Sequence, residues 1–96
     1  DLPPGFNLLD VNDGATYAGV KYFGWEMISD AGKIMISVTA DENGNVQVNG
    51  FVNDEDDNIF NFHNAEYIED AFDKPGATTV AINKLVNEML QQYPGL

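Results

Sequence analysis

The 96-residue chain contains no cysteine, no arginine and only four lysines. Without cysteine, neither a disulfide framework nor a thiolate metal site can form. Nucleic-acid binding requires several cations on one face to neutralise phosphates, and four scattered lysines against sixteen carboxylates do not supply them. The same shortage disfavours an anionic membrane surface, and no apolar run approaches the ~20 residues of a transmembrane helix. We therefore expect neither nucleic acid nor a membrane as a partner.

The rest of the composition is that of a small globular protein. Hydrophobic residues make up 44% of the chain and aromatic residues 11%, which places it well outside the range of disordered chains. A chain of this length buries enough surface for one core. No repeat or linker divides the sequence, so we predict a single domain over residues 1–96, with residues 1–14 as an extended N-terminal arm.

Three stretches have the pattern of β-strands. Residues 33–40 and 45–52 place apolar side chains at alternate positions, and the Asn-Gly pair at 43–44 between them is a strong hairpin signal. Residues 15–29 are rich in aromatic and β-branched residues, with Gly24 as a natural place for a bulge or for a break into two strands.

Two helices are predicted after the hairpin. Residues 64–73 fit a short acidic helix with Asn64 as its N-cap and Phe72 on its apolar side, and residues 78–93 fit an amphipathic helix with a continuous apolar stripe. Residues 59–62 allow a fourth strand before them. We therefore predict an α+β fold, in which an antiparallel β-meander of three or four strands carries the C-terminal helix on one face and the short acidic helix at one end.

Negative charge is concentrated in one part of the chain. The forty residues from Ile34 to Asp73 carry ten carboxylates and no cation, so they supply −10 of the net charge of −12. Acidic runs often serve solubility alone, but such a field also speeds the encounter with a cationic partner. We predict a partner-binding face made of seven of these carboxylates: Asp54, Glu55, Asp56, Asp57, Glu66, Glu69 and Asp70.

Metal binding and catalysis have less support. The acidic turns at 10–14 and 41–45 resemble fragments of calcium loops, but both miss the ligand spacing of an EF-hand. The only histidine, His63, lies near Glu66, and such a pair can act as a general base. The chain offers no cysteine nucleophile, no phosphate loop and no second histidine to complete a site. We predict no catalytic residue, no metal site and no cofactor.

The sequence leaves different classes of function open. The first is a non-enzymatic acidic protein that docks an anionic face on a basic protein surface, as an inhibitor, immunity protein or nucleic-acid mimic does; this function predicts a cytoplasmic location. The alternative is an acidic module of an exported or cell-surface protein, with charge serving solubility, salt tolerance or calcium binding, and the asparagine-rich, cysteine-free composition suits it. A third hypothesis, an enzyme using His63, predicts a cleft around that residue. The sequence determines neither the localisation nor the oligomeric state.

Overall fold

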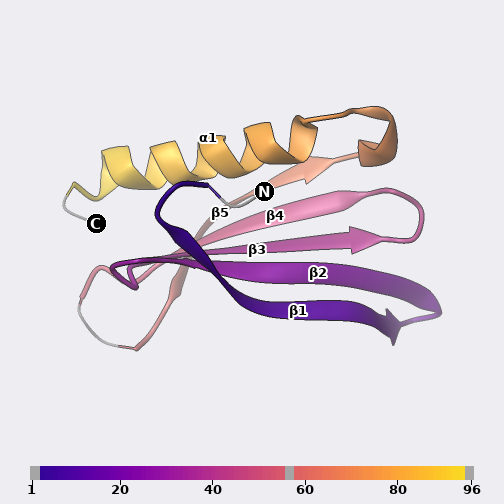
Figure 1. Ribbon diagram of the computed structural model, residues 1–96, viewed down its shortest axis with the longest axis horizontal. Coiled ribbons are helices and arrows are strands. Elements are labelled where there is room, and N and C mark those ends of the chain that lie inside the picture. Colours follow the sequence, from indigo (N-terminus) through magenta and orange to yellow (C-terminus); the bar gives the residue numbers. More distant parts are fainter. Residues whose placement is uncertain (1–2, 56–57, 95–96) are drawn as a thin grey trace.

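The structure, a computed structural model, describes residues 3–55 and 58–94. It forms one antiparallel sheet of five strands whose order in the sheet is their order in the chain (Figure 1). The strands are β1 (Phe6–Tyr17), β2 (Val20–Ser29), β3 (Ile34–Asp41), β4 (Val46–Val52) and β5 (Asn61–Ile68). A short 3₁₀ turn, η1 (Ala71–Asp73), and the helix α1 (Ala77–Gln92) follow them.

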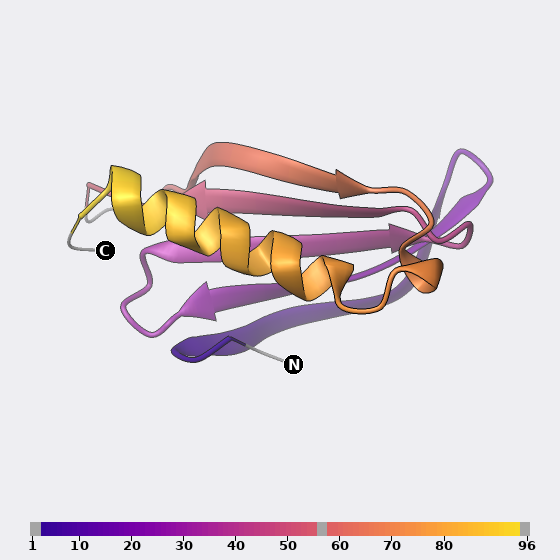
Figure 2. The ribbon, with the colours of Figure 1, turned by 90° about the horizontal axis from the view of Figure 1, so that it is seen from above.

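Helix α1 runs diagonally across one face of the sheet, where it packs on β3, β4 and β5 (Figures 1 and 2). Within the described residues, no helix covers the opposite face of the sheet. The core lies between the two layers and consists of the following apolar side chains: Met27, Ile34, Ile36, Val38, Val46, Val48, Val52, Ala81, Ile82, Leu85 and Met89. The predicted α+β class and the C-terminal helix on one face are confirmed. No helix among the described residues is long and apolar enough to cross a membrane.

The number of strands differs from the prediction of three or four, because the chain reverses direction within the stretch predicted as one strand. Ala18 and Gly19 both adopt positive φ angles, 51° and 78°, as a type I′ hairpin turn requires. Residues 15–17 therefore belong to β1, together with much of the segment predicted as an N-terminal arm. The Ala-Gly pair lacks the asparagine or aspartate that usually marks this turn.

Gly24 does not interrupt β2. It pairs in regular register with Asn12 of β1 and Thr39 of β3. The irregularities in this pair of strands fall between Leu8 and Asp10 and between Asn12 and Ala15. Bulges in an edge strand of this kind disrupt its ladder and hinder pairing with another chain.

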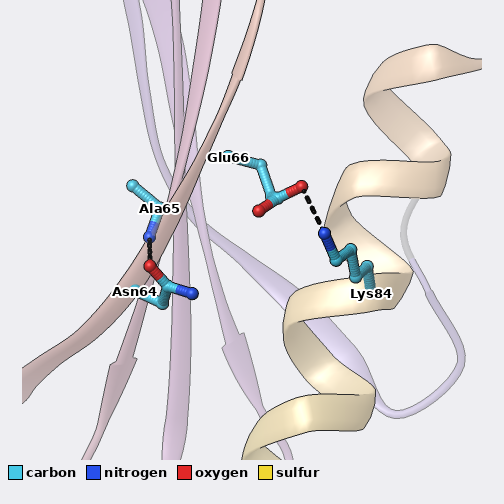
Figure 3. Close-up of polar contacts among 4 residues, drawn as sticks. All are labelled: Asn64, Ala65, Glu66 and Lys84. Carbon is cyan, nitrogen blue, oxygen red and sulfur yellow. Dashed lines mark hydrogen bonds and ion pairs between the residues drawn. The ribbon is translucent and has the colours of Figure 1, made fainter.

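The predicted acidic helix over residues 64–73 is wrong. Residues 61–68 form the edge strand β5, which pairs with β4, and only residues 71–73 adopt a helical turn. The side-chain oxygen of Asn64 accepts a hydrogen bond from the N–H of Ala65 at 2.8 Å, one residue on, so it does not cap a helix (Figure 3). Pairing with the free edge of β4 gives the backbone N–H and C=O groups of this segment their hydrogen-bond partners. The helical spacing of its apolar side chains does not outweigh these hydrogen bonds.

Candidate functional site

The carboxylates predicted as a partner-binding face are distributed over both ends of the sheet. Asp54 and Glu55 are exposed in the loop between β4 and β5. Glu69 and Asp70 are exposed directly after β5, at the opposite end. The intervening strand β5 has eight residues, so it spans roughly 25 Å. The structure therefore brings Glu69 together with Asp70, and Asp54 together with Glu55, but it does not join the two pairs.

Glu66, the member of the set that lies within β5, is directed toward helix α1 (Figure 3). Its carboxylate accepts a hydrogen bond from the Lys84 ammonium at 3.0 Å. This hydrogen bond and the charge of Glu66 raise the pKa of Lys84. The charge of Glu66 is thus compensated within the protein. The remaining two members of the set, Asp56 and Asp57, lie outside the described residues.

A second group of carboxylates comes together at the end of the sheet where β5 finishes. Because β3 and β5 both flank β4, the β3–β4 turn and the η1 segment meet there (Figure 1). The N–H of Ala71 donates to the carbonyl of Gly44 at 2.7 Å, and a Cβ on Gly44 would lie only 3.0 Å from the Phe72 ring. This contact gathers five carboxylates, which we call the acidic end: Asp41, Glu42, Glu69, Asp70 and Asp73.

Asp41 holds the β3–β4 turn while it contributes to the acidic end. Its carboxylate accepts hydrogen bonds from the backbone N–H groups of Asn45 at 3.0 Å and Asn43 at 2.9 Å, and from the Asn45 amide at 3.2 Å. These bonds, led by the one from the Asn45 backbone, lower the pKa of Asp41. Asp41 therefore stays ionised at neutral pH.

The other four carboxylates of the acidic end are exposed. Two lysines lie close to them: Lys74 follows Asp73 in sequence, and the carbonyl of Lys21 accepts a hydrogen bond from the N–H of Glu42 at 3.1 Å. The ammonium of Lys21 lies 5.5 Å from the centroid of the Phe23 ring. Five carboxylates against two lysines leave this end with an excess of negative charge.

Phe72 lies at the surface among these carboxylates. The residue is 73% exposed, although one side of its ring rests on Gly44. Large aromatic residues are enriched at the centres of protein interfaces, where charged residues form the rim. The sequence pattern assigned Phe72 to the apolar side of a helix, and only the strand-to-turn transition after β5 exposes it.

His63 and Glu66, the pair considered for catalysis, are not hydrogen-bonded to each other within the described structure. The half-buried His63 ring packs edge-to-face on Tyr93, with the ring centroids 6.1 Å apart. The carboxylate that shares a shallow surface depression with His63 is Glu88 of helix α1. Because 25 residues separate His63 from Glu88 in the chain, no local sequence pattern indicates that they are neighbours. The depression supplies a histidine and a carboxylate, and its other lining residues, Asn64, Gln91 and Gln92, are amides.

No group of three or more histidine, aspartate or glutamate side chains within residues 3–55 and 58–94 is arranged to hold a metal ion. Comparison with protein-family models, curated proteins and solved structures finds no significant match to this chain. The function is accordingly inferred from the residues themselves.

Proposed function

We propose that the protein is a non-enzymatic binder that docks an anionic surface on a basic protein, in the manner of an inhibitor or a nucleic-acid mimic. The acidic end supports this proposal, because two separate segments that carry five carboxylates between them meet at the same end of the sheet as the exposed Phe72. Of the carboxylates in the predicted face, Glu69 and Asp70 belong to this surface.

Charge and the aromatic ring have different roles in such a complex. The field of a protein with a net charge of −12 draws in a cationic partner and raises the association rate, an effect that salt weakens. The Phe72 ring supplies apolar area that becomes buried on docking and slows dissociation. A partner with a basic surface and an apolar pocket matches both features.

The partner is identified by using the intact protein as bait in lysates of its source organism and of that organism's hosts or competitors. Bound proteins are released with sodium chloride at about 0.5 M, where the Debye length falls to roughly 4 Å. A stoichiometric basic protein in the eluate is then purified for kinetic measurements. An oligonucleotide that displaces the bait from this protein would support the nucleic-acid-mimic form of the proposal.

Two variants with the same change in net charge then locate the docking surface. Glu69→Lys/Asp70→Lys reverses charge at the acidic end, and Asp54→Lys/Glu55→Lys reverses it at the opposite end of the sheet. Because steering depends on where the charge lies, the first variant should slow association at low salt by roughly tenfold and the second much less. Equal effects would show that only net charge matters, and the reverse order would move the docking surface to the β4–β5 loop; either result contradicts the proposal.

A further inference from the structure

The helix-free face of the sheet contains a hollow of about 170 Å³ above Gly24. Gly24 lies between Tyr22 and Glu26 along β2 and pairs with Asn12 on one side and Thr39 on the other. Because these positions share one face of the sheet, the missing side chain leaves a gap among larger neighbours. We call this the Gly24 hollow, and its polar lining consists of Asp10, Asn12, Tyr22, Glu26, Ser37 and Thr39.

The close approach of β2 and β3 explains why position 24 has no side chain. A Cβ added to Gly24 would lie 2.5 Å from the carbonyl oxygen of Val38, well inside van der Waals contact. Only glycine fits at this position without movement of the backbone. A glycine in the middle of a strand weakens the strand, and such glycines often mark a place where a ligand or another backbone approaches closely.

The polar side chains around the hollow have unused hydrogen-bonding capacity. Glu26, Ser37 and Thr39 are half-buried, and their side chains form no hydrogen bond with any residue that the structure describes. Asp10 uses one carboxylate oxygen to accept the N–H of Val11 at 2.9 Å, which leaves its second oxygen. Asn12 uses only its carbonyl oxygen, so its amide N–H groups are available. Three strands thus present carboxylates, hydroxyls and an amide to one small volume.

Charge determines the kind of ligand that this volume accepts. Asp10 and Glu26 are cross-strand partners, and no lysine lines the hollow. Lys21, the lysine of β2, projects from the opposite face of the sheet, where its ammonium group lies over the Phe23 ring. Two carboxylates that have no counter-ion among the described residues repel anions and favour a cation that carries several N–H donors. A planar guanidinium group meets this requirement, because it bonds carboxylates in pairs and stacks on aromatic rings such as that of Tyr22.

We infer that the Gly24 hollow binds the guanidinium group of an arginine side chain. This inference rests on the proposed function, because it names the group by which a basic partner is recognised. The two surfaces adjoin, since Tyr22 at one end of the hollow pairs across strands with Asp41 of the acidic end. A partner that docks at the acidic end therefore has an arginine-accepting site next to the contact.

The test uses the intact ¹⁵N-labelled protein and N-acetyl-L-arginine amide, with the uncharged isostere N-acetyl-L-citrulline amide as a control ligand. Two isosteric variants are compared with the wild type. Glu26→Gln removes a carboxylate from the hollow, and Glu42→Gln removes one from the acidic end. We expect the arginine ligand to shift the amide resonances of Gly24, Glu26 and Thr39 saturably, and Trp25 fluorescence to follow the same curve.

The affinity for the arginine ligand should fall roughly tenfold in Glu26→Gln, because a charged hydrogen bond is lost, and remain within about twofold in Glu42→Gln. The citrulline ligand should bind none of the three proteins. Equal losses in the two variants would reduce the effect to overall charge and overturn the inference. Shifts confined to the acidic end would overturn the inference as well. Methyl glucoside is tested as a further ligand, and if it saturates the hollow in place of the arginine ligand, the hollow is a sugar site and the inference is overturned.

Failure of this inference and failure of the proposed function have different signatures. If the arginine ligand leaves the hollow unperturbed while Glu69→Lys/Asp70→Lys still slows association with a basic protein, the hollow inference falls and the proposed function stands. If the arginine ligand binds as expected but no basic protein associates with the chain, the hollow binds a guanidinium and the docking proposal falls.

Discussion

Replacing Gly24 with alanine tests the packing argument on which the hollow depends. The added Cβ would lie 2.5 Å from the Val38 carbonyl oxygen and 3.4 Å from the Thr39 Cα, and both neighbours are backbone atoms. Neither can rotate away, so β2 and β3 must separate locally. Overpacking of this kind costs about 1–3 kcal/mol.

Alanine also has a favourable effect that must be subtracted. It restricts the unfolded chain more than glycine does, which stabilises a protein by about 0.4–1 kcal/mol where the backbone conformation is compatible. The difference is a net loss of up to about 2.5 kcal/mol in the free energy of unfolding, and because the clashing atoms belong to the backbone we expect a loss of about 1–2 kcal/mol. For a domain of this size the loss corresponds to a fall in Tm of roughly 5–15 °C.

Gly50→Ala is the matched control, because it adds the same methyl group to β4, another strand of the same sheet. Its Cβ would lie 3.0 Å from the terminal methyl of Met89, which is the far end of a flexible side chain and can move. The change in the free energy of unfolding should stay below about 1 kcal/mol. Urea unfolding followed by Trp25 fluorescence measures both variants. If Gly24→Ala is as stable as the wild type, or loses no more stability than Gly50→Ala, the reasoning about the close approach of β2 and β3 is refuted.

Further expectations concern the core, the β3–β4 turn and the exposed aromatic ring. Met89 is fully buried between α1 and the sheet, so Met89→Ala should cost about 2–5 kcal/mol in urea unfolding, and a cost below about 1 kcal/mol would contradict the packing of the helix. The folded-state pKa of Asp41 is depressed below 3.8, so its stabilising contribution is complete above that pH and is lost as the pH falls through the lower folded value. The Tm difference between wild type and Asp41→Asn should therefore shrink between about pH 5 and about pH 2, and a difference that grows on acidification would refute this sign. Phe72→Ala should speed dissociation of a captured basic partner by roughly tenfold or more with an unchanged association rate, whereas a change confined to association would contradict its role as an apolar anchor.

The sequence predicted the elements that local signals specify. The β3–β4 hairpin follows from period-two alternation on both sides of an Asn-Gly pair, and the C-terminal helix follows from its apolar stripe. Both are found close to the predicted residues, at Ile34–Asp41, Val46–Val52 and Ala77–Gln92. These patterns succeed because each element carries its own period and its own end signals within a short stretch.

The sequence could not identify elements that depend on distant partners. Residues 64–73 have apolar side chains at helical spacing, but β4 needs a neighbour on its open edge, and residues 61–68 provide it as β5. The Ala18-Gly19 turn carries no marked signal of its own, and pairing between β1 and β2 fixes it. In both places the backbone hydrogen bonds of the sheet outweigh a local preference.

For the candidate sites, the sequence by itself determined that the protein is strongly acidic, that one forty-residue stretch carries most of the charge, and that four lysines cannot form a basic face. Only the tertiary structure decided which carboxylates act together. The fold brings the β3–β4 turn into contact with the η1 segment, pairs Glu66 with Lys84, and opens a hollow at Gly24. The physical reason is that charge is a property of composition, whereas the positions of charges relative to one another depend on contacts between residues far apart in the chain.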